Sequence, residues 1–258
     1  MTRLVFITGA SSGIGQALAL RFHQAGYRLA LAARRTQEVR SWAEAANIDA
    51  SRCEIYSADV SDIDSIVAAG QACLASLGVP DVVIANAGIS IGMDSAIRAD
   101  LDVMARTFAT NNIGVAATFH PFISAMTERG SGALVGIGSV AGIRGLPGHG
   151  AYCASKAAVI AYCESLRGEL KALGVKVVTI CPGYIDTPLT QKNRYAMPFL
   201  MPPEAFANQA FTAIEAGASY RVIPWQMGAV AKLLRLLPNA MFDKAFVGRA
   251  RKPRQTEN

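Results

Sequence analysis

The sequence lacks any uninterrupted apolar run that reaches the roughly 20 residues of a membrane-spanning helix. The apolar run near the N-terminus stops at a glycine loop, which is atypical of a signal peptide and typical of a first buried strand. We therefore expect a cytoplasmic protein. Charged residues are also few, at 17%, against 52% hydrophobic residues, so a large core is expected and disorder is not.

Cysteines are few and irregularly placed. There are five, an odd number, and no Cys-x-x-Cys pair occurs. Most of them lie inside apolar segments, so we expect free, buried thiols and no metal site.

The basic excess of the chain is confined to its last quarter. Residues 1–191 hold 15 Lys/Arg and 15 Asp/Glu, whereas residues 192–258 hold 10 and 4 and end in Arg249, Arg251, Lys252 and Arg254. A nucleic-acid-binding domain usually carries a basic stripe on its main body. We therefore expect no nucleic-acid partner.

Short apolar runs alternate regularly with longer helical segments. This alternation predicts an α/β fold: a doubly wound parallel sheet of the Rossmann type, in three layers and one domain. We assign residues 1–224 to that domain and 225–258 to a basic C-terminal extension with an amphipathic helix. The predicted strands are 4–8, 28–33, 53–57, 81–85, 133–137, 175–181 and 220–223, and the predicted helices include 36–46, 63–77, 101–128, 152–173 and 203–216.

A glycine-rich turn follows the first predicted strand and opens a helix that ends near residue 25. Backbone N–H groups and the helix dipole at such a turn form a cradle for anions, and glycine is needed where a side chain would block a pyrophosphate. The spacing is Gly-x-x-x-Gly-x-Gly. The predicted cofactor-binding residues of this turn are Gly9, Ser11, Ser12, Gly13, Ile14 and Gly15.

Polar residues at the ends of the next strands indicate which dinucleotide is bound. An acidic residue after the second strand would hold a ribose 2′-hydroxyl, and an arginine would accommodate a 2′-phosphate. This chain has Arg34 and Arg35 there and no carboxylate, which favours NADP(H) over NAD(H). Asp59 and Val60 follow the third strand, where the carboxylate could accept a hydrogen bond from an adenine amino group. Asn86, Ala87 and Gly88 follow the fourth, where small residues permit close approach of a cofactor.

A serine, a tyrosine and a lysine follow the fifth predicted strand. Ser139 ends an apolar run, and Tyr152 and Lys156 are four residues apart in a predicted helix, so they share one face. An ammonium beside a phenol favours the phenolate, which predicts a lowered tyrosine pKa. Such a tyrosine is a general acid/base, and the serine could hold a substrate oxygen beside it. The alternative is an ordinary pair on a helix surface.

Two adjacent asparagines, Asn111 and Asn112, interrupt the long helical region 101–128. Asparagine is a poor helix former. These residues therefore predict a kink or a buried polar role.

Together these motifs resemble the short-chain dehydrogenase/reductase family over residues 4–224. The resemblance rests on TGASSGIG at 8–15, NAG at 86–88, Asn111, Ser139, Tyr152 with Lys156, and PGYIDT at 182–187. It implies that Tyr152 is the acid/base and that Lys156 lowers its pKa and binds the nicotinamide ribose. It also implies that Ser139 positions the substrate oxygen and that Asn111 holds a helix kink and a water of the proton relay. Cofactor contacts implied near the last strands are Pro182, Gly183, Ile185 and Thr187.

The implied activity is hydride transfer between NADP(H) and a carbonyl or secondary alcohol. The alternatives are a non-catalytic NADP(H)-binding sensor and an epimerase or dehydratase on the same scaffold. The family also implies a homodimer or homotetramer that pairs through the helices around Asn111 and Tyr152.

The chain departs from the family pattern at a few positions. Ala85 stands where the family usually has an asparagine, which would remove one polar contact. Gly136 and Gly138 stand where bulkier residues are common, which predicts a looser floor of the site. His149, three residues before Tyr152, is either a substrate contact or a loop residue without a chemical role.

The resemblance implies that residues 188–203 lie over the substrate. Their apolar side chains suit a bulky, apolar small molecule, and the alternative is a packed loop. The extension that follows has a helical apolar segment with Lys232 and Arg235, broken at Pro238. Three interpretations remain open for it: packing on the pocket or a partner subunit, peripheral contact with a membrane surface, or a loose tail.

Overall fold

Seven parallel strands form a single sheet in the order β3-β2-β1-β4-β5-β6-β7 in the computed structural model, which describes residues 2–193, 195–248 and 252–254. Arg249 and Arg251 of the basic end lie outside these residues. The strands are β1 (Leu4–Thr8), β2 (Arg28–Ala33), β3 (Cys53–Ser57), β4 (Val82–Ala85), β5 (Gly132–Ile137), β6 (Val175–Pro182) and β7 (Tyr220–Ile223). The predicted doubly wound parallel sheet is confirmed.

The inner strands are mostly apolar because both faces of the sheet are covered; Arg28 of β2 and Lys176 of β6 are exceptions near the strand starts. Every residue of β1 is buried, as is every residue of β4. The strand β1 pairs with β2 on one side and β4 on the other, so Phe6 lies beside both Ala30 and Val83. The chain order therefore reverses direction at β1 and β4, where open α/β sheets bind their ligands.

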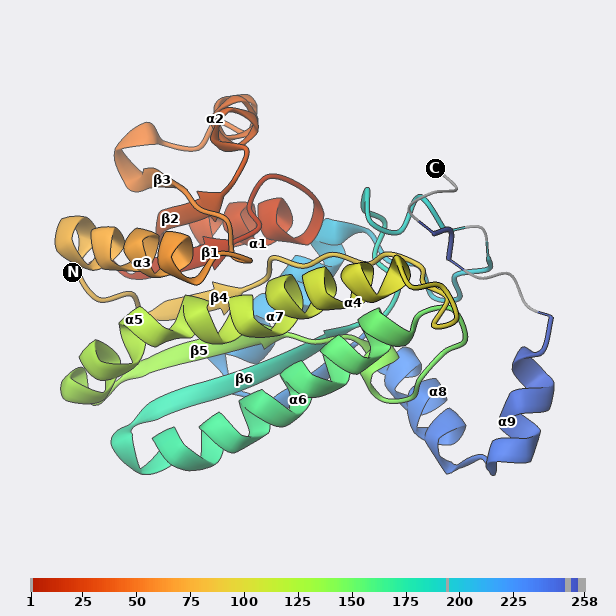
Figure 1. The fold of residues 1–258 in the computed structure, drawn as a ribbon. Coiled ribbons are helices and arrows are strands. Elements are labelled where there is room, and N and C mark those ends of the chain that lie inside the picture. The colour runs from red at the N-terminus through yellow and green to blue at the C-terminus, as the bar shows by residue number, and fades with distance from the viewer. Residues whose placement is uncertain (1, 194, 249–251, 255–258) are drawn as a thin grey trace.

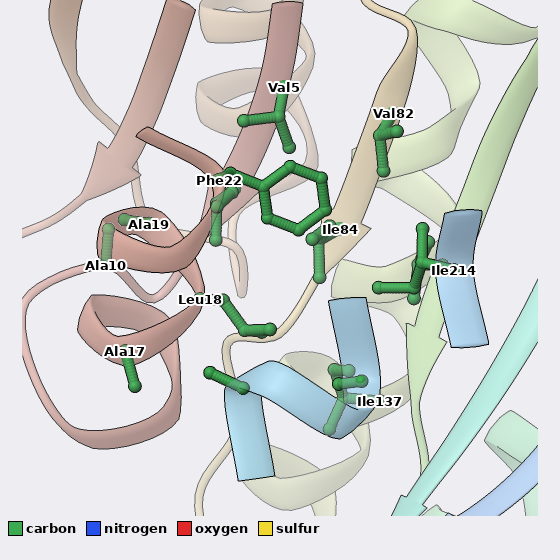
Figure 2. Close-up of a cluster of buried hydrophobic side chains, with 14 of the residues drawn as sticks. Val5, Ala10, Ala17, Leu18, Ala19, Phe22, Val82, Ile84, Ile137 and Ile214 are labelled. Atoms are coloured by element: carbon green, nitrogen blue, oxygen red, sulfur yellow. The ribbon is translucent and has the colours of Figure 1, made fainter. Parts of the chain in front are cut away.

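Helices cover both faces of the sheet and complete three layers (Figure 1). Buried residues of α1 (Gly13–Gln24), α2 (Thr36–Ala45) and α7 (Pro203–Glu215) form the core on one face. Those of α3 (Ile63–Leu77), α5 (Gly114–Arg129) and α6 (Gly150–Leu170) form the core on the other. Figure 2 shows Phe22 and Leu18 of α1 packed against Val5 and Ile84 of the sheet.

The helix predicted over 101–128 is divided. Its parts are α4 (Asp100–Phe108), the π-helical turn η2 (Ala109–Ile113) and α5. The helix is interrupted by a π-bulge that contains both asparagines, and the predicted buried polar role is confirmed for Asn111, which is fully buried. The helix that carries Tyr152 begins two residues earlier than predicted, at Gly150, and it ends at Leu170, before the 3-10 turn η4 (Lys171–Leu173).

Two further helices, α8 (Trp225–Leu236) and α9 (Asn239–Phe246), follow the last strand. They lie beyond one end of the sheet, at the lower right of Figure 1. No helix among the described residues is long and apolar enough to span a bilayer. All five cysteines are free thiols and four of them are buried, as expected.

Replacement of Phe22 by alanine tests the core between α1 and the sheet. Phe22 is fully buried and contacts the rings of Tyr27 and Phe211 edge-on, each with centroids 4.9 Å apart. We expect Phe22→Ala to lower the free energy of unfolding by about 3–5 kcal/mol in urea denaturation, because it removes apolar burial and leaves a cavity. The control Leu173→Ala, at a side chain that is 50% exposed, should change it by less than about 1 kcal/mol. Equal effects would contradict this description of the core.

Candidate active site

A cleft of about 590 Å³ opens at the carboxyl ends of the central strands, among the loops that follow β1, β2, β3, β4 and β5. It brings together most of the residues predicted from the sequence. Those that line it are Gly9, Ser11, Ser12, Gly13, Ile14, Arg34, Arg35, Asp59, Val60, Asn86, Ala87, Gly88, Tyr152, Lys156 and Thr187.

The other predicted site residues do not line the cleft and are placed beside it. Gly15 lies in α1, and Asn111 and Ser139 are buried and bonded to groups of the cleft wall. Pro182 pairs with Ile223 in the sheet. The Ile185 side chain is buried, and its carbonyl accepts the Thr190 hydroxyl at 2.5 Å. Gly183 is the last of the predicted residues that do not line the cleft.

The glycine turn has the shape that a pyrophosphate requires. Gly9 and Gly13 have φ of +69° and +56°, a region that favours glycine. A Cβ on Gly15 would lie 2.2 Å from the Gly9 carbonyl oxygen, so only glycine lets α1 approach the turn this closely. The Ser12 side chain does not cap α1, which leaves its first N–H groups directed at the cleft. These residues fit the diphosphate of a dinucleotide.

Asn86 braces this turn from the neighbouring strand. Its Nδ2 donates to the carbonyl oxygens of Thr8 at 3.0 Å and Gly9 at 3.3 Å, while its backbone N–H donates to the Thr8 hydroxyl at 3.1 Å. Because these N–H groups of Asn86 all find acceptors on Thr8 and Gly9, the glycine turn is held in one geometry. Asn86 therefore has a structural role in addition to lining the cleft.

The two arginines after β2 lie at one end of the cleft. Arg35 donates to the Ser11 hydroxyl at 3.1 Å and pairs with Glu38. Arg34 lies 3.4 Å from the Asp59 carboxylate. Burial would raise the pKa of Asp59, but hydrogen bonds from Ser61 and the Arg34 charge outweigh it and hold that pKa below its usual value. Two guanidiniums and a serine hydroxyl therefore converge beside the glycine turn.

Asn111 links the π-turn to the loop after β4. Its Nδ2 donates to the Ile89 carbonyl at 3.0 Å and to the Ser155 hydroxyl at 2.9 Å, and its Oδ1 accepts from the Ile89 N–H at 2.9 Å. The side chain is fully buried. Since Ser155 lies between Tyr152 and Lys156, this amide fixes the cleft wall relative to the helix that carries both of them.

Tyr152 and Lys156 share one face of α6, as predicted. The Lys156 ammonium lies 5.9 Å from the centre of the Tyr152 ring and donates to the Ile137 carbonyl at 2.7 Å. Ser139 accepts the Ala141 N–H through its Oγ at 3.1 Å, and its hydroxyl lies close enough to the Tyr152 hydroxyl to influence the pKa of that tyrosine. The absence of a side chain on Gly88 leaves the ammonium open to the cleft, because a Cβ there would lie 3.5 Å from Nζ.

The prediction of a lowered tyrosine pKa is wrong for this arrangement. Burial is the largest influence and raises the pKa of Tyr152 to about 12, against the opposing effect of the Ser139 hydrogen bond. Burial likewise lowers the pKa of Lys156 to about 8. The ammonium is buried and donates to a backbone carbonyl, and the Tyr152 side chain is partly buried in the cleft wall, so loss of hydration dominates over the attraction that the spacing alone suggests.

The looser floor predicted at Gly136 and Gly138 is also a mistaken expectation. A Cβ on Gly136 would lie 2.4 Å from the Cys163 sulfur, and one on Gly138 would lie 2.9 Å from the Cys181 sulfur. Both cysteines are buried. Their side chains fill the space that bulkier residues at these two positions would take, so the floor is close-packed.

Several residues of the site were not anticipated. Arg106 and Lys192 line the cleft. Ser155 bonds Asn111, as described above. No motif marks Arg106, Lys192 or Ser155; their only common signal is proximity in the chain to residues that were predicted.

For His149 a substrate contact and a loop role were both left open. The residue is buried and its Nε2 lies 3.2 Å from the Tyr195 hydroxyl, which ties the loop before α6 to the stretch 188–203.

Comparisons with known proteins agree with this geometry. A family model described as short chain dehydrogenase matches residues 3–197. An uncharacterized oxidoreductase of Myxococcus xanthus is 38% identical over 246 residues, 94% of this chain and 96% of that protein. Two solved structures share the fold. A short-chain dehydrogenase/reductase of Burkholderia phymatum in complex with NAD has 24% identity and a TM-score of 0.81, and the match covers 90% of this chain and 92% of that one. A short-chain dehydrogenase of Sphingobium yanoikuyae in complex with NADPH has 25% identity and a TM-score of 0.77, and the match covers 92% of this chain and 97% of that one.

The pH dependence of stability tests the burial of Lys156. Its pKa of about 8 lies below the ordinary value of 10.5, so between these pH values the unfolded chain binds more protons than the folded one. Stability from this group therefore rises as pH rises through that window, by at most about 3 kcal/mol. We expect the rise, measured by urea unfolding, to be smaller in Lys156→Met and unchanged in the exposed control Lys171→Met. An identical rise of stability with pH in the wild type and in Lys156→Met would contradict the lowered pKa of Lys156.

Proposed function

The chain belongs to the short-chain dehydrogenase family and is an oxidoreductase, and from this premise we propose that it transfers a hydride between NADP(H) and a carbonyl or secondary alcohol. The observation that supports this most is the placement of Tyr152, Lys156 and the glycine turn around one cleft. A nicotinamide supplies hydride chemistry when bound, and the protein supplies position and one proton.

Tyr152 is proposed as the group that exchanges this proton with the substrate oxygen. Its hydroxyl lies near that of Ser139, so a substrate oxygen that reaches the tyrosine can accept from both hydroxyls. With a pKa raised to about 12, Tyr152 is protonated at neutral pH and is suited to donate to a carbonyl that is being reduced. Its buried neighbour Lys156 would favour the phenolate that remains after donation.

NADP(H) is proposed over NAD(H) because Arg34 and Arg35 lie at the end of the cleft beside Ser11. Guanidinium groups bind phosphate oxygens in a planar, bidentate manner. The Asp59 carboxylate, which was expected to accept a hydrogen bond from an adenine amino group, is engaged by Ser61 and Arg34. Among the similar solved structures one holds NAD and another NADPH, so the choice rests on the arginines.

The substrate is proposed to lie between Tyr152 and the stretch 188–203. Pro188 and Leu189 of that stretch line the cleft, and Ile89 and Ile91 line it as well. These side chains suit an apolar carbonyl compound. A homodimer or homotetramer and a cytoplasmic location stay predictions; Leu101 on α4 and Ile113 in the π-turn, which are 44% and 49% exposed, would suit pairing of subunits there.

Removal of the Tyr152 hydroxyl tests the proposed chemistry. We expect Tyr152→Phe to lower turnover of carbonyl compounds by about 10²–10⁴-fold, because general acid catalysis is lost, while the Kd for NADPH stays the same. Consumption of NADPH in a screen of ketones and aldehydes gives the first value, and fluorescence titration gives the second. The matched control is Tyr162→Phe on the same helix, whose ring packs against Phe119. Full turnover in Tyr152→Phe would refute the role of this tyrosine.

Removal of the two arginines tests the cofactor preference. We expect Arg34→Ala and Arg35→Ala each to weaken NADPH binding by about 10-fold or more while NADH binding changes little, because each loses a charged hydrogen bond to the 2′-phosphate. Dissociation constants for both cofactors provide the measurement, with the exposed Arg40→Ala as control. A wild-type protein that prefers NADH would show that the proposal is incorrect.

A further inference from the structure

The most exposed large apolar side chains of the described residues lie together in the C-terminal helices. Elsewhere the highest exposed fraction of such a side chain is 52%, at Ile63. In and directly after α8 and α9 the fractions are 81% for Leu236, 79% for Val247, 73% for Trp225, 64% for Leu233 and 59% for Met241. Scattered apolar residues on a surface are ordinary, but a concentration of this kind indicates a binding surface.

On α8 these side chains form a stripe. Trp225, Ala229, Leu233 and Leu236 are spaced by four, four and three residues and are all exposed, so they lie along one face of the helix. We refer to these four residues as the α8 stripe. The opposite face is already used: Met227 and Ala231 are buried, and Gly228 packs against Val222 of β7. The helix therefore has one apolar face toward the protein and a second toward the outside.

The stripe is held in place. Arg144 donates to the carbonyl oxygens of Leu234 and Leu237 at the end of α8, the latter at 2.7 Å. Its guanidinium also lies 3.9 Å from the centre of the Phe242 ring of α9. The loop that follows the active-site serine thus fixes both helices, and the outer face of α8 is presented by a folded element.

Positive charge accompanies the stripe. Lys232 and Arg235 of α8 and Lys244 of α9 are all exposed, and Asp243 is the one acidic residue of the two helices. At 100° per residue, Lys232 and Arg235 flank the same edge of the stripe. An apolar face bordered by lysine and arginine is the pattern of a helix that lies in the interface of an anionic bilayer.

We propose that α8 is a membrane-docking element that inserts its stripe into the headgroup region of a bilayer containing anionic phospholipid. A second copy of the chain fits less well. A stable interface uses about 20–30 residues on each side, far more than the stripe offers. A two-fold contact would also bring equal patches together, with Lys232 and Arg235 facing like charges. Anionic headgroups complement these cations, and tryptophan suits the interface between water and lipid.

This surface adjoins the cleft without depending on its chemistry. The helix α8 begins directly after β7, at the carboxyl edge of the sheet, and contacts the turn η3 (Val140–Gly142) that follows Ser139. Docking would place the edge of the sheet that carries the cleft near the lipid. Membrane binding can therefore be tested apart from the proposed function.

Vesicle binding of the full chain tests the proposal. We expect co-sedimentation with vesicles of phosphatidylcholine containing phosphatidylglycerol and much weaker binding to phosphatidylcholine alone. Leu233→Gln and Leu236→Gln should each weaken binding about 10-fold, because each removes an exposed apolar side chain that the bilayer would bury. The double charge reversal Lys232→Glu and Arg235→Glu should weaken it at least about 25-fold and abolish the preference for phosphatidylglycerol.

The matched control is Leu173→Gln, at a side chain that is 50% exposed and lies in the turn before β6, at the opposite edge of the sheet. It should bind vesicles as the wild type does. Trp42→Phe leaves Trp225 as the sole tryptophan, since the chain has two, and its emission should shift to the blue when anionic vesicles are added.

Three results would overturn the proposal: no binding to anionic vesicles by the wild type, equal weakening by Leu173→Gln, or an unshifted Trp225 emission in bound protein. Sedimentation velocity tests the alternative that a second copy of the chain binds the stripe. If Leu233→Gln dissociates an oligomer and the wild type ignores vesicles, the stripe is a contact between copies of this chain and the proposal is incorrect.

Discussion

A lysine ammonium removed from water organises the candidate site. Lys156 is 4% exposed, and its amine is held by the Ile137 carbonyl at the end of β5. Burial of a cation is costly unless its donors are satisfied, so the surrounding chain must supply partners and exclude competing contacts. Gly88 leaves room for the amine on the cleft side, and the close packing of Cys163 against Gly136 closes the floor beneath it. The opposite pKa directions of Lys156 and Tyr152 follow from this single loss of hydration.

Asparagine side chains hold the loops around this lysine at defined positions. Asn86 ties the loop after β4 to the glycine turn, and Asn111 ties the same loop to α6 through Ser155. The Asn86 side chain donates to two carbonyl oxygens, and the Asn111 side chain both donates and accepts. A shorter or apolar side chain could not make these contacts. The π-turn at Ala109–Ile113 is what directs Asn111 inward, so a local irregularity of a helix positions two distant loops.

The C-terminal helices extend this arrangement outward. Arg144 lies in the loop between Ser139 and Tyr152, and it also fixes the ends of α8 and α9. The loop between Ser139 and Tyr152 and the exposed α8 stripe are therefore parts of one connected structure. The exposed α8 stripe and the cleft therefore share one anchor. Of the three alternatives left open for the C-terminal extension, the one we propose is contact with a membrane surface.

The sequence by itself determined the order of elements, the parallel sheet and the edge at which Gly9, Arg34, Asn86, Ser139 and Tyr152 meet. Apolar periodicity indicates which residues of an element are buried, and in a parallel sheet the carboxyl ends of all strands lie at the same edge. Only the tertiary structure decided the direction of the Tyr152 pKa, the filling of the Gly136 floor by Cys163 and the outward face of α8. These properties depend on which distant segments exclude water from a group, as when Asn111 meets Ser155 across 44 residues of chain, and no local pattern encodes that contact.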